Sequence, residues 1–422
     1  MCLSETSSLD DWLTWQEQLH VKEIDLGLQR VSKVYKQLAA EYLKQPYTIT
    51  VAGTNGKGSS VALLESILMC AGYNVGVYST PHLQHYNERI RVNGVPVDDP
   101  LLTASFQRIN QSRLDTSLSY FEFGTLAALD IFNHASVDIQ ILEVGLGGRL
   151  DAVNIIDANA ALITSIDIDH VDWLGSDKSS IALEKAGVFR PQQKAVCGDA
   201  SVPDSLREFA LTLGTDLLLA GIDYSVDIKA KHWCLAPQNQ RPTRYSLPSL
   251  AGEHQIHNAA AVITLLKHIS GDITVNEQHI ETGLMHTSLP GRLQKIADKP
   301  SIYLDVAHNA ESAAALATFI KKMDKQGDVH AVFSILPDKD MAAVISPFKE
   351  IVNHWSLAPL NIPRGQSISA IEAAFTQQGI ETYSAHGSIR QAFDHAKKQA
   401  SKDDLVIVFG SFYVVAACLD AV

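Results

Sequence analysis

Short apolar runs alternate with amphipathic stretches of helical spacing along most of the chain, and this alternation predicts an α/β protein. Early in the chain, Tyr47–Thr50 is a β-branched and aromatic run that predicts a buried strand. Ser60–Cys70 is rich in Ala, Leu, Ile and Met and predicts a helix that stops at Ala71-Gly72. A glycine-rich segment separates the two, so the chain passes from a strand through a loop into a helix.

The same pattern predicts further elements before and after this unit. Helices are expected at Leu9–Leu19, from about Arg30 to Leu43, at Phe121–Phe132 and at Ser179–Ala186. Strands are expected at Val75–Tyr78, Val137–Gly145 and Ala160–Ser165. The pattern from Asp204 to Leu247 is weaker and indicates a helix, a short β section at Tyr224–Leu235 and a proline-rich loop.

Beyond Ser288–Leu293, which interrupts the helices and resembles a hinge, strands and helices alternate regularly. The strand candidates are Ser301–Leu304, Val329–Ser334, Trp355–Leu357, Glu381–Tyr383 and Leu405–Phe409. The helix candidates are Ala310–Met323, Met341–Val352, Ile368–Gln378, Ile389–Gln399 and Phe412–Leu419. This alternation predicts a mostly parallel sheet with helices on both faces. Because 422 residues are too many for one ordinary core, we expect two domains, residues 1–288 and 289–422.

The composition narrows the partners that such a protein could have. The net charge is −13, from 34 basic and 47 acidic residues, which argues against nucleic acid as the main partner. The five cysteines are scattered without a C-x-x-C pair, as in a reduced cytosolic protein. No apolar run reaches the roughly 18 residues of a membrane span, and residues 1–11 are unlike a signal peptide. We therefore expect a cytoplasmic protein without membrane association.

The glycine-rich segment Gly53–Ser59 reads Gly-Thr-Asn-Gly-Lys-Gly-Ser and predicts a phosphate-binding loop. Free backbone N–H groups at a helix N-terminus attract anions, and the helix dipole adds to the attraction. Lys57 would reach the terminal phosphates, and the Ser59 hydroxyl would face Mg²⁺ or a phosphate. Only Thr54 and Asn55 separate the first glycine from the Gly-Lys pair, unlike the common G-x-x-x-x-G-K-[ST] pattern. The alternative is a glycine-rich turn that carries a solvated lysine.

Polar side chains also stand where later strands are expected to end. Ser79 and Thr80 could ligate a hard cation beside a phosphate, or they could belong to a capped turn. Glu143 ends an apolar run, in the place of a carboxylate that holds Mg²⁺ during phosphoryl transfer, although such an acid could also only cap a turn. Three glycines follow it and allow close backbone approach, and Arg149 and Asp151 among them are ligand candidates.

Four further residues have both a functional and a structural interpretation. His170 lies among three aspartates after a predicted strand, which suggests a metal ligand. Lys185 lies near the end of a predicted helix, where the alternative is a solvated surface cation paired with an acid. Glu122 could face a ligand or act as an acid in the first turn of its helix. Asn258, near a helix start, could bond an adenine, but its position favours a cap.

Together these residues resemble the Mur ligase superfamily and, within it, the folylpolyglutamate synthase and dihydrofolate synthase family. The resemblance covers essentially the whole chain. Its motifs are Gly53–Ser59, Pro81–Leu83, Glu143–Ala152, Asp169-His170, Glu184–Gly187, His254-Gln255 with Asn258, Pro290–Arg292 and Asp305–Asn309. Glu23–Leu28 and Tyr120–Glu122 also match the bacterial bifunctional members of that family.

The resemblance implies an N-terminal P-loop ATPase domain and a smaller C-terminal Rossmann-like ligase domain, with ATP between them. It implies a nucleotide site formed by Gly53, Thr54, Asn55, Gly56, Lys57, Gly58, Ser59, Asn258, Arg292 and Asp305. One Mg²⁺ would lie near Ser59, Thr80 and Glu143, and a second near His170. Lys185 matches a lysine that is carbamylated in such ligases, and a monovalent cation is a further candidate. The substrate would contact Asp25, Leu26, Gly27, Phe121, Glu122, Leu150, Asp151 and Ala152.

The implied reaction begins with transfer of the γ-phosphoryl group of ATP to a carboxylate of dihydropteroate, tetrahydrofolate or a derivative. L-Glutamate then attacks the acyl phosphate, while Lys57 and the metals neutralise charge and His308 orients the glutamate. The alternatives are a folylpolyglutamate synthase without dihydropteroate activity, a cell-wall Mur ligase and a nucleotide-binding module without turnover. Glu143, His170 and Lys185 together favour chemistry over the last of these. A monomer is expected.

Overall fold

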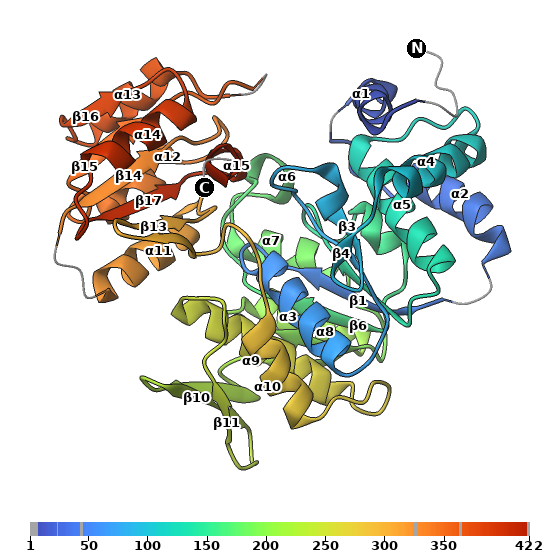
Figure 1. The fold of residues 1–422 in the computed structure, drawn as a ribbon. Helices are drawn as coiled ribbons and strands as arrows, with labels where there is room; N and C mark the ends of the chain where they lie inside the picture. The colour runs from blue at the N-terminus through green and yellow to red at the C-terminus, as the bar shows by residue number, and fades with distance from the viewer. Residues whose placement is uncertain (1–6, 23, 43–44, 324–326, 363–364, 420–422) are drawn as a thin grey trace. The chain divides into compact units, whose positions relative to one another are not determined.

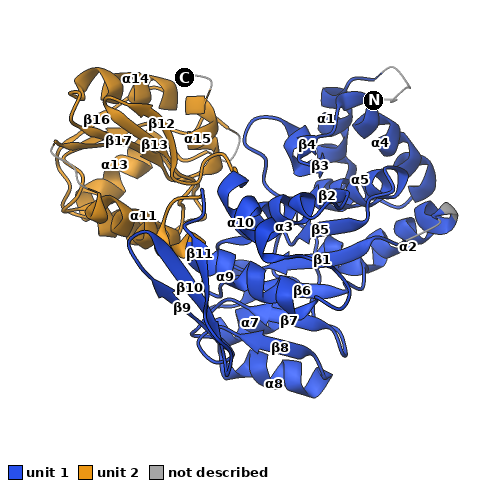
Figure 2. Ribbon diagram, turned by 60° about the horizontal axis from the view of Figure 1, so that its bottom comes forward, with its two compact units in different colours: residues 1–249, 256–287 blue, residues 250–255, 288–422 orange. Residues whose placement is uncertain are grey.

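The computed structural model describes residues 7–22, 24–42, 45–323, 327–362 and 365–419. Cys2, Glu23 and Leu43, which entered the expectations above, lie outside the described residues. The chain divides into two compact units, residues 1–249 with 256–287 and residues 250–255 with 288–422 (Figure 2). Each unit is built around its own mostly parallel sheet.

The first unit contains an eight-stranded sheet in the order β4-β3-β2-β5-β1-β6-β7-β8. Its strands are β1 (Tyr47–Ala52), β2 (Val75–Tyr78), β3 (Ile90–Val92), β4 (Val95–Pro96), β5 (Ile139–Glu143), β6 (Ala160–Ile163), β7 (Lys194–Cys197) and β8 (Asp216–Leu219). From β2 to β8 neighbouring strands pair in parallel, while β3 and β4 form an antiparallel edge. The central strands β1 and β5 are buried almost throughout, which explains why they read as continuous apolar runs.

Helices surround this sheet. They are α1 (Leu9–Leu19), α2 (Gln29–Leu38), α3 (Lys57–Cys70), α4 (Asp99–Arg113), α5 (Tyr120–His134), α6 (Val171–Leu174), α7 (Lys178–Ala186), α8 (Asp204–Leu213), α9 (Glu253–His268) and α10 (Glu277–His286), with 3₁₀ turns η1 (Ala39–Glu41), η2 (Tyr86–Arg89) and η3 (Ala152–Ile155). Helices α1, α2, α4 and α5 pack together as one group (Figure 1), and α3 packs against α10. Among the described residues, no helix combines the length and the apolar character needed to cross a membrane.

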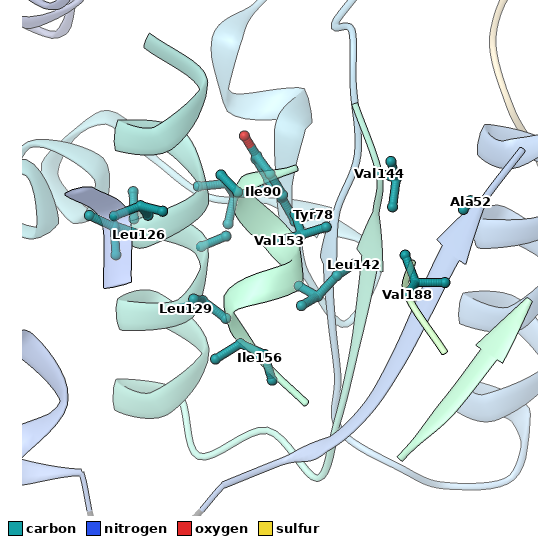
Figure 3. Packing of buried hydrophobic residues seen from close by; sticks show 14 of the residues in the cluster. Ala52, Tyr78, Ile90, Leu126, Leu129, Leu142, Val144, Val153, Ile156 and Val188 are labelled. Carbon is teal, nitrogen blue, oxygen red and sulfur yellow. The ribbon is translucent and has the colours of Figure 1, made fainter. Parts of the chain in front are cut away.

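The core of the first unit joins the α5 group to the sheet. Figure 3 shows Leu129 of α5 beside Ile156, with Val153 and Leu142 of β5 close by, while Leu126 lies at the other edge of the same helix. All five side chains are buried in one apolar cluster. Since η3 and its flanking turn carry two of these anchors, packing holds the segment after β5 in a fixed place.

A small antiparallel sheet in the order β11-β10-β9 also belongs to the first unit. It consists of β9 (Tyr224–Ile228), β10 (His232–Pro237) and β11 (Thr243–Ser246). Trp233 and Tyr245 are directly opposite each other on β10 and β11, and their ring centroids lie 5.1 Å apart. This aromatic cross-strand pair stabilises the short ribbon.

The second unit contains a six-stranded sheet in the order β12-β13-β17-β14-β15-β16. Its strands are β12 (Gln294–Asp298), β13 (Ser301–Leu304), β14 (Val329–Phe333), β15 (His354–Leu357), β16 (Tyr383–Ala385) and β17 (Leu405–Phe409). Its helices are α11 (Ala310–Lys322), α12 (Met341–Ile345), α13 (Ile368–Gln377), α14 (Ile389–Gln399) and α15 (Phe412–Leu419), with the 3₁₀ turn η4 (Ser346–Phe348). Only β12 runs antiparallel, and Phe333, Trp355, Phe375 and Phe409 fill the core between the layers.

The mostly parallel sheets confirm the predicted fold class, but several boundaries differ from the predicted ones. Helix α3 begins at Lys57 rather than Ser60, because Gly56 supplies a left-handed N-cap with φ of +84°. The helix predicted over 341–352 ends at Ile345, and Pro347, which has no N–H to donate, lies in the 3₁₀ turn that follows. Strand β16 lies two residues beyond its predicted position, and the helix predicted to reach Leu43 ends at Leu38. The pattern also missed the helices α4, α6 and α10, the parallel strands β7 and β8, and the antiparallel strands β3, β4, β11 and β12.

Helix α10 approaches α3 so closely at Gly283 that a side chain there would meet backbone. A Cβ at this position would lie 2.7 Å from Ile67 Cα and 2.9 Å from Ile67 N. We expect Gly283→Ala to lower the free energy of unfolding by about 1–3 kcal/mol through overpacking, as measured by urea denaturation. Gly271→Ala is the control, because its Cβ would meet nothing closer than Lys194 Nζ at 3.8 Å. Equal stability of the two variants would contradict the close packing.

Candidate active site

The predicted phosphate loop connects β1 to α3 and is bonded to the strand end that follows β6. The Thr54 N–H donates to the Ser165 carbonyl (2.8 Å), and the Asn55 N–H donates to the Ser165 hydroxyl (3.0 Å). The Thr164 hydroxyl donates to the Asn55 carbonyl (2.6 Å). The sequence-based reasoning missed both loop partners, Thr164 and Ser165. Their position at the end of a predicted strand was the signal that could have found them.

Two of the loop glycines are required by geometry. Gly53 has φ of +147°, and a Cβ there would overlap the Thr164 hydroxyl. Gly56 has φ of +84°, and a Cβ there would lie 2.5 Å from Asn258 Oδ1. The loop backbone therefore keeps a conformation that other residues adopt only with strain. The contact also shows that the predicted cap role of Asn258 is wrong: this residue is the sixth of α9, and its side chain lies beside the loop.

Lys57 and Ser59 occupy the first turn of α3. The Lys57 ammonium donates to the carbonyls of Gly53 (2.9 Å) and Thr54 (3.0 Å), so the loop itself holds the charge. Ser59 is buried, whereas the alternative interpretation of a simple surface turn predicts a solvated lysine and an exposed hydroxyl. The arrangement is that of an anion site at a helix N-terminus.

Strand pairing brings Glu143 and Thr80 to the same sheet edge as the loop. Glu143 is opposite Val51 at the end of β5, and β5 also pairs with β2. The Thr80 N–H donates to Glu143 Oε2 (3.3 Å), and the Glu143 side chain is buried. Among the described residues, no group of three or more His, Cys, Asp and Glu side chains is placed to hold a metal. A carboxylate and hydroxyls nevertheless fit Mg²⁺, which keeps several waters and shares substrate phosphates.

Asp151 organises the turn that follows β5. Its Oδ2 accepts from the N–H groups of Gly145 (3.0 Å) and Leu146 (2.9 Å), and its Oδ1 accepts from Val153 N–H (3.0 Å). Burial raises the pKa of Asp151 to about 6, although the three backbone bonds and Lys57 act in the opposite direction. Phe121 lies at the same turn, since a Cβ on Gly145 would be 2.8 Å from its ring. The structure therefore brings together two of the predicted substrate residues.

A second pair of predicted substrate residues, Asp25 and Glu122, meets at Arg30. Arg30 forms ion pairs with Asp25 (2.5 Å) and Glu122 (3.2 Å), and His20 Nε2 lies 3.1 Å from Asp25. Glu122 also caps its own helix, because Ser119 N–H donates to its carboxylate (2.7 Å). Of the two interpretations of Glu122, the acid of the first helical turn is the one observed.

His170 and Lys185 lie in the segments that follow β6. His170 is exposed, has φ of +52° and precedes α6, and its N–H donates to Asp169 Oδ1 (2.8 Å). Nearby Asp167 pairs with Lys178 (3.1 Å). Lys185 of α7 is buried, so its interpretation as a solvated surface cation is wrong. A buried ammonium requires partners or chemical modification, which keeps this residue a functional candidate.

The candidates of the second unit gather around Phe412. The Arg292 guanidinium lies 5.0 Å from the Phe412 ring centroid, and the His308 ring lies 6.2 Å from it. Asp305 accepts from Leu293 N–H and Ala307 N–H, both at 2.8 Å. Desolvation raises the pKa of Asp305, against the effect of these bonds and of Arg292. The sequence-based reasoning did not point to Phe412 as the common neighbour of Arg292 and His308; an aromatic residue just after a strand and a Gly-Ser turn was the available signal.

The loop, the strand-end carboxylate and the second α/β unit define a ligase of the Mur type. Residues 51–266 match the Mur ligase middle domain, and residues 291–412 match the glutamate ligase domain of Mur ligases. The chain is 42% identical to the dihydrofolate synthase/folylpolyglutamate synthase of Escherichia coli over 417 residues, which are 99% of this chain and 96% of that relative. The chain therefore belongs to the dihydrofolate synthase/folylpolyglutamate synthase family.

Solved structures of this family have the same fold. E. coli FolC in complex with DHPP and ADP superimposes with a TM-score of 0.93, at 42% identity, covering 100% of this chain and 99% of that one. A bifunctional folylpolyglutamate synthase/dihydrofolate synthase with Mn, AMPPNP and L-glutamate bound gives a TM-score of 0.91 at 40% identity, covering 100% and 99%. These likenesses confirm the predicted family, fold and ATP-dependent ligase class.

His82 lies in the loop between β2 and η2 and is neutral. Its Nδ1 accepts from Arg89 Nε (2.8 Å), which requires an unprotonated nitrogen. Burial, and then the nearby Arg89 guanidinium, lower the pKa of His82 to about 4. Since this value lies below the ordinary 6.5, the unfolded chain binds the extra proton between the two values.

The free energy of unfolding should therefore fall as the pH falls through that window. His82→Asn keeps an oxygen acceptor for Arg89 but does not titrate, so we expect a shallower loss of stability in the variant. Urea denaturation at several pH values from about 7 to about 4.5 measures the slopes. The same slope in wild type and variant would contradict a neutral, half-buried His82.

Proposed function

We propose that this chain uses ATP to activate the carboxylate of dihydropteroate and of reduced folates, and joins it to the amine of L-glutamate. The observation that carries the proposal is the phosphate loop Gly53–Ser59 beside the buried carboxylate of Glu143 at one sheet edge. That combination suits phosphoryl transfer, in which positioning and charge neutralisation supply most of the catalysis. The relatives solved with DHPP and ADP, and with Mn, AMPPNP and L-glutamate, support the same substrates here.

ATP phosphates would lie on the N–H groups of the loop and of the first turn of α3. Lys57 would exchange its bonds to the loop carbonyls for phosphate oxygens, which keeps the ammonium paired in both states. Asn258, which lies against Gly56, would contact the nucleotide next to the phosphates. Arg292 and Asp305 of the second unit are the further nucleotide candidates.

Ser59, Thr80 and Glu143 would hold a divalent cation, and His170 would contribute to a second cation site. A bound divalent cation would neutralise phosphate charge during transfer. Glu143 suits this role because its carboxylate is buried and anchored by the Thr80 N–H, so its direction is fixed before a ligand binds. A monovalent cation near this site stays a prediction.

The folate substrate would lie along Leu26, Gly27, Phe121, Leu150 and Ala152, with carboxylates at Asp25, Glu122 and Asp151. Phe121 offers an aromatic face for a flat ring system, and its ring packs against Tyr78 at 5.7 Å. Asp25 and Glu122 form ion pairs with Arg30, so the orientation of both carboxylates is fixed before a substrate binds. This mixture of apolar surface and few polar groups is typical of small-molecule sites.

Transfer of the γ-phosphoryl group to the substrate carboxylate gives an acyl phosphate and ADP. The glutamate amine, oriented by His308, then attacks the acyl carbon and releases phosphate, so an amide forms. The acyl phosphate must be kept from water until the amine attacks it. Lys185 acts in this scheme as a carbamate that would face the second cation. A monomeric, cytoplasmic enzyme stays a prediction.

A product assay tests the whole proposal. Purified protein with ATP and Mg²⁺ should release phosphate only when glutamate and a pterin substrate are both present. Mass spectrometry should show one added glutamate on dihydropteroate and one or more on tetrahydrofolate. Product from tetrahydrofolate alone would indicate a monofunctional folylpolyglutamate synthase, and no phosphate release with either substrate would reject the ligase.

Lys185 gives a second, independent test. Lys185→Ala should lose at least about 100-fold in turnover while nucleotide binding, measured by calorimetry, stays within about threefold of wild type. Isotopically labelled bicarbonate should produce a carbamate NMR signal in the wild type that Lys185→Ala lacks. Lys178→Ala is the control, because Lys178 lies on the same helix but is exposed and paired with Asp167. Unchanged turnover of Lys185→Ala would exclude a catalytic role.

A further inference from the structure

Arg91 links the phosphate-loop helix to the strand end that carries Thr80. It lies on β3, at the antiparallel edge of the sheet, opposite Val77 of β2. Its Nε contacts both carboxylate oxygens of Glu65 on α3 (3.1 and 3.2 Å), and its NH2 donates to Glu65 Oε2 (2.8 Å). Both side chains are largely buried, with exposed fractions of 16% for Arg91 and 9% for Glu65.

The other branch of the same guanidinium reaches the loop after β2. NH1 of Arg91 donates to the Ser79 hydroxyl (3.0 Å) and to the Glu88 carbonyl (3.2 Å). Ser79 is the residue before Thr80, and its N–H donates to the Arg89 carbonyl (2.9 Å). One planar, rigid fork therefore joins α3, the end of β2 and η2.

The remaining bonds of this loop make the connection tight. The Glu88 carboxylate accepts from three successive N–H groups, those of Leu83 (2.7 Å), Gln84 (2.9 Å) and His85 (2.8 Å). The loop from Ser79 to Arg89 is thus closed on itself, and Arg91 bonds to it at Ser79 and at Glu88. A displacement of Arg91 would shift the whole loop, including the Thr80 N–H that donates to Glu143.

We propose that Arg91 is a positioning residue for the divalent cation site, because it fixes the Ser79-Thr80 strand end relative to the helix that begins at the phosphate loop. The inference rests on the proposed function, in which Ser59, Thr80 and Glu143 hold the cation. Arg91 itself contacts neither cation nor substrate. It couples α3, which carries Ser59, to the loop that carries Thr80 through the Glu65–Arg91–Ser79 chain.

The test uses Arg91→Lys and Ser79→Ala in the full chain. Lysine keeps the charge but cannot bond Glu65 in a fork and also reach Ser79 and Glu88, while Ser79→Ala removes a single acceptor. Mutation of residues that hydrogen-bond to metal ligands typically lowers metal affinity by about 10- to 100-fold. We expect Mn²⁺ affinity in the presence of AMPPNP, followed by the EPR signal of free Mn²⁺, to fall by that amount in Arg91→Lys and by about threefold to tenfold in Ser79→Ala.

Arg108→Lys is the matched control. Arg108 forms a similar fork with the fully buried Asp130, with bonds of 2.6 and 3.0 Å between α4 and α5, although Arg108 itself is more exposed (34%) than Arg91. Among the described residues, no hydrogen bond or ion pair joins this pair to Thr80. We expect Arg108→Lys to lower the melting temperature as much as Arg91→Lys while leaving Mn²⁺ affinity unchanged. The Arg91→Lys variant should also need a correspondingly higher Mg²⁺ concentration to reach half of its maximal rate of amide formation.

Two results would overturn the inference. Wild-type Mn²⁺ affinity in the folded Arg91→Lys and Ser79→Ala variants would show that the Arg91 guanidinium does not position the cation site. An equal loss of affinity in Arg108→Lys would show that any buried ion pair of this unit has the same effect. Failure of the proposed function is distinguishable from both, because the wild-type protein itself would then bind no Mn²⁺ with AMPPNP and form no product.

Discussion

The bonds between the phosphate loop and the strand end after β6 are the constraint on which the site depends. Thr164 and Ser165 form hydrogen bonds with the backbone N–H groups of Thr54 and Asn55 and with the Asn55 carbonyl. These bonds leave the other N–H groups of the loop for a ligand. Gly53 and Gly56 permit this only because both adopt positive φ and neither has a Cβ. The strain that another residue would introduce is absent, and the candidate anion site has its shape before any anion binds.

Sheet topology then determines which side chains can join this loop. Because β1 lies between β5 and β6 and all three strands are parallel, their carboxyl ends lie side by side at the loop. The carboxyl end of β2 lies next to that of β5 at the same edge of the sheet. The register places Glu143 opposite Val51 and one residue beyond the pair Leu142 and Tyr78. Residues separated by about a hundred positions therefore share one edge, as expected for ligands of open α/β sheets.

The sequence predicted elements better than it predicted contacts, for physical reasons. The continuous apolar runs of β5 and β17 and the helical period of α14 are local signals, and each reappears as an element. Antiparallel edge strands such as β3 are short and half-exposed, so they have no such period. Asn258 illustrates the limit at the site: position near a helix start predicted a cap, whereas the tertiary contact with Gly56 decides its place. Motif resemblance supplied the candidate site residues, but only the fold shows that Arg30 joins Asp25 and Glu122.

The distribution of charge gives a physical reason why the proposed site would need a divalent cation. The chain carries a net charge of −13, and three arginines near the strand ends are matched by carboxylates: Arg91 by Glu65, Arg30 by Asp25 and Glu122, and Arg149 by Glu184. The charge of these arginines is already balanced by carboxylates, so they contribute little to neutralising a polyphosphate. Backbone dipoles and Lys57 supply only part of the required positive charge, while Glu143 adds a negative one. A nucleotide would bind such a site well only together with cations, and in the proposed mechanism the geometry between Thr80 and Glu143 would then matter for phosphoryl transfer.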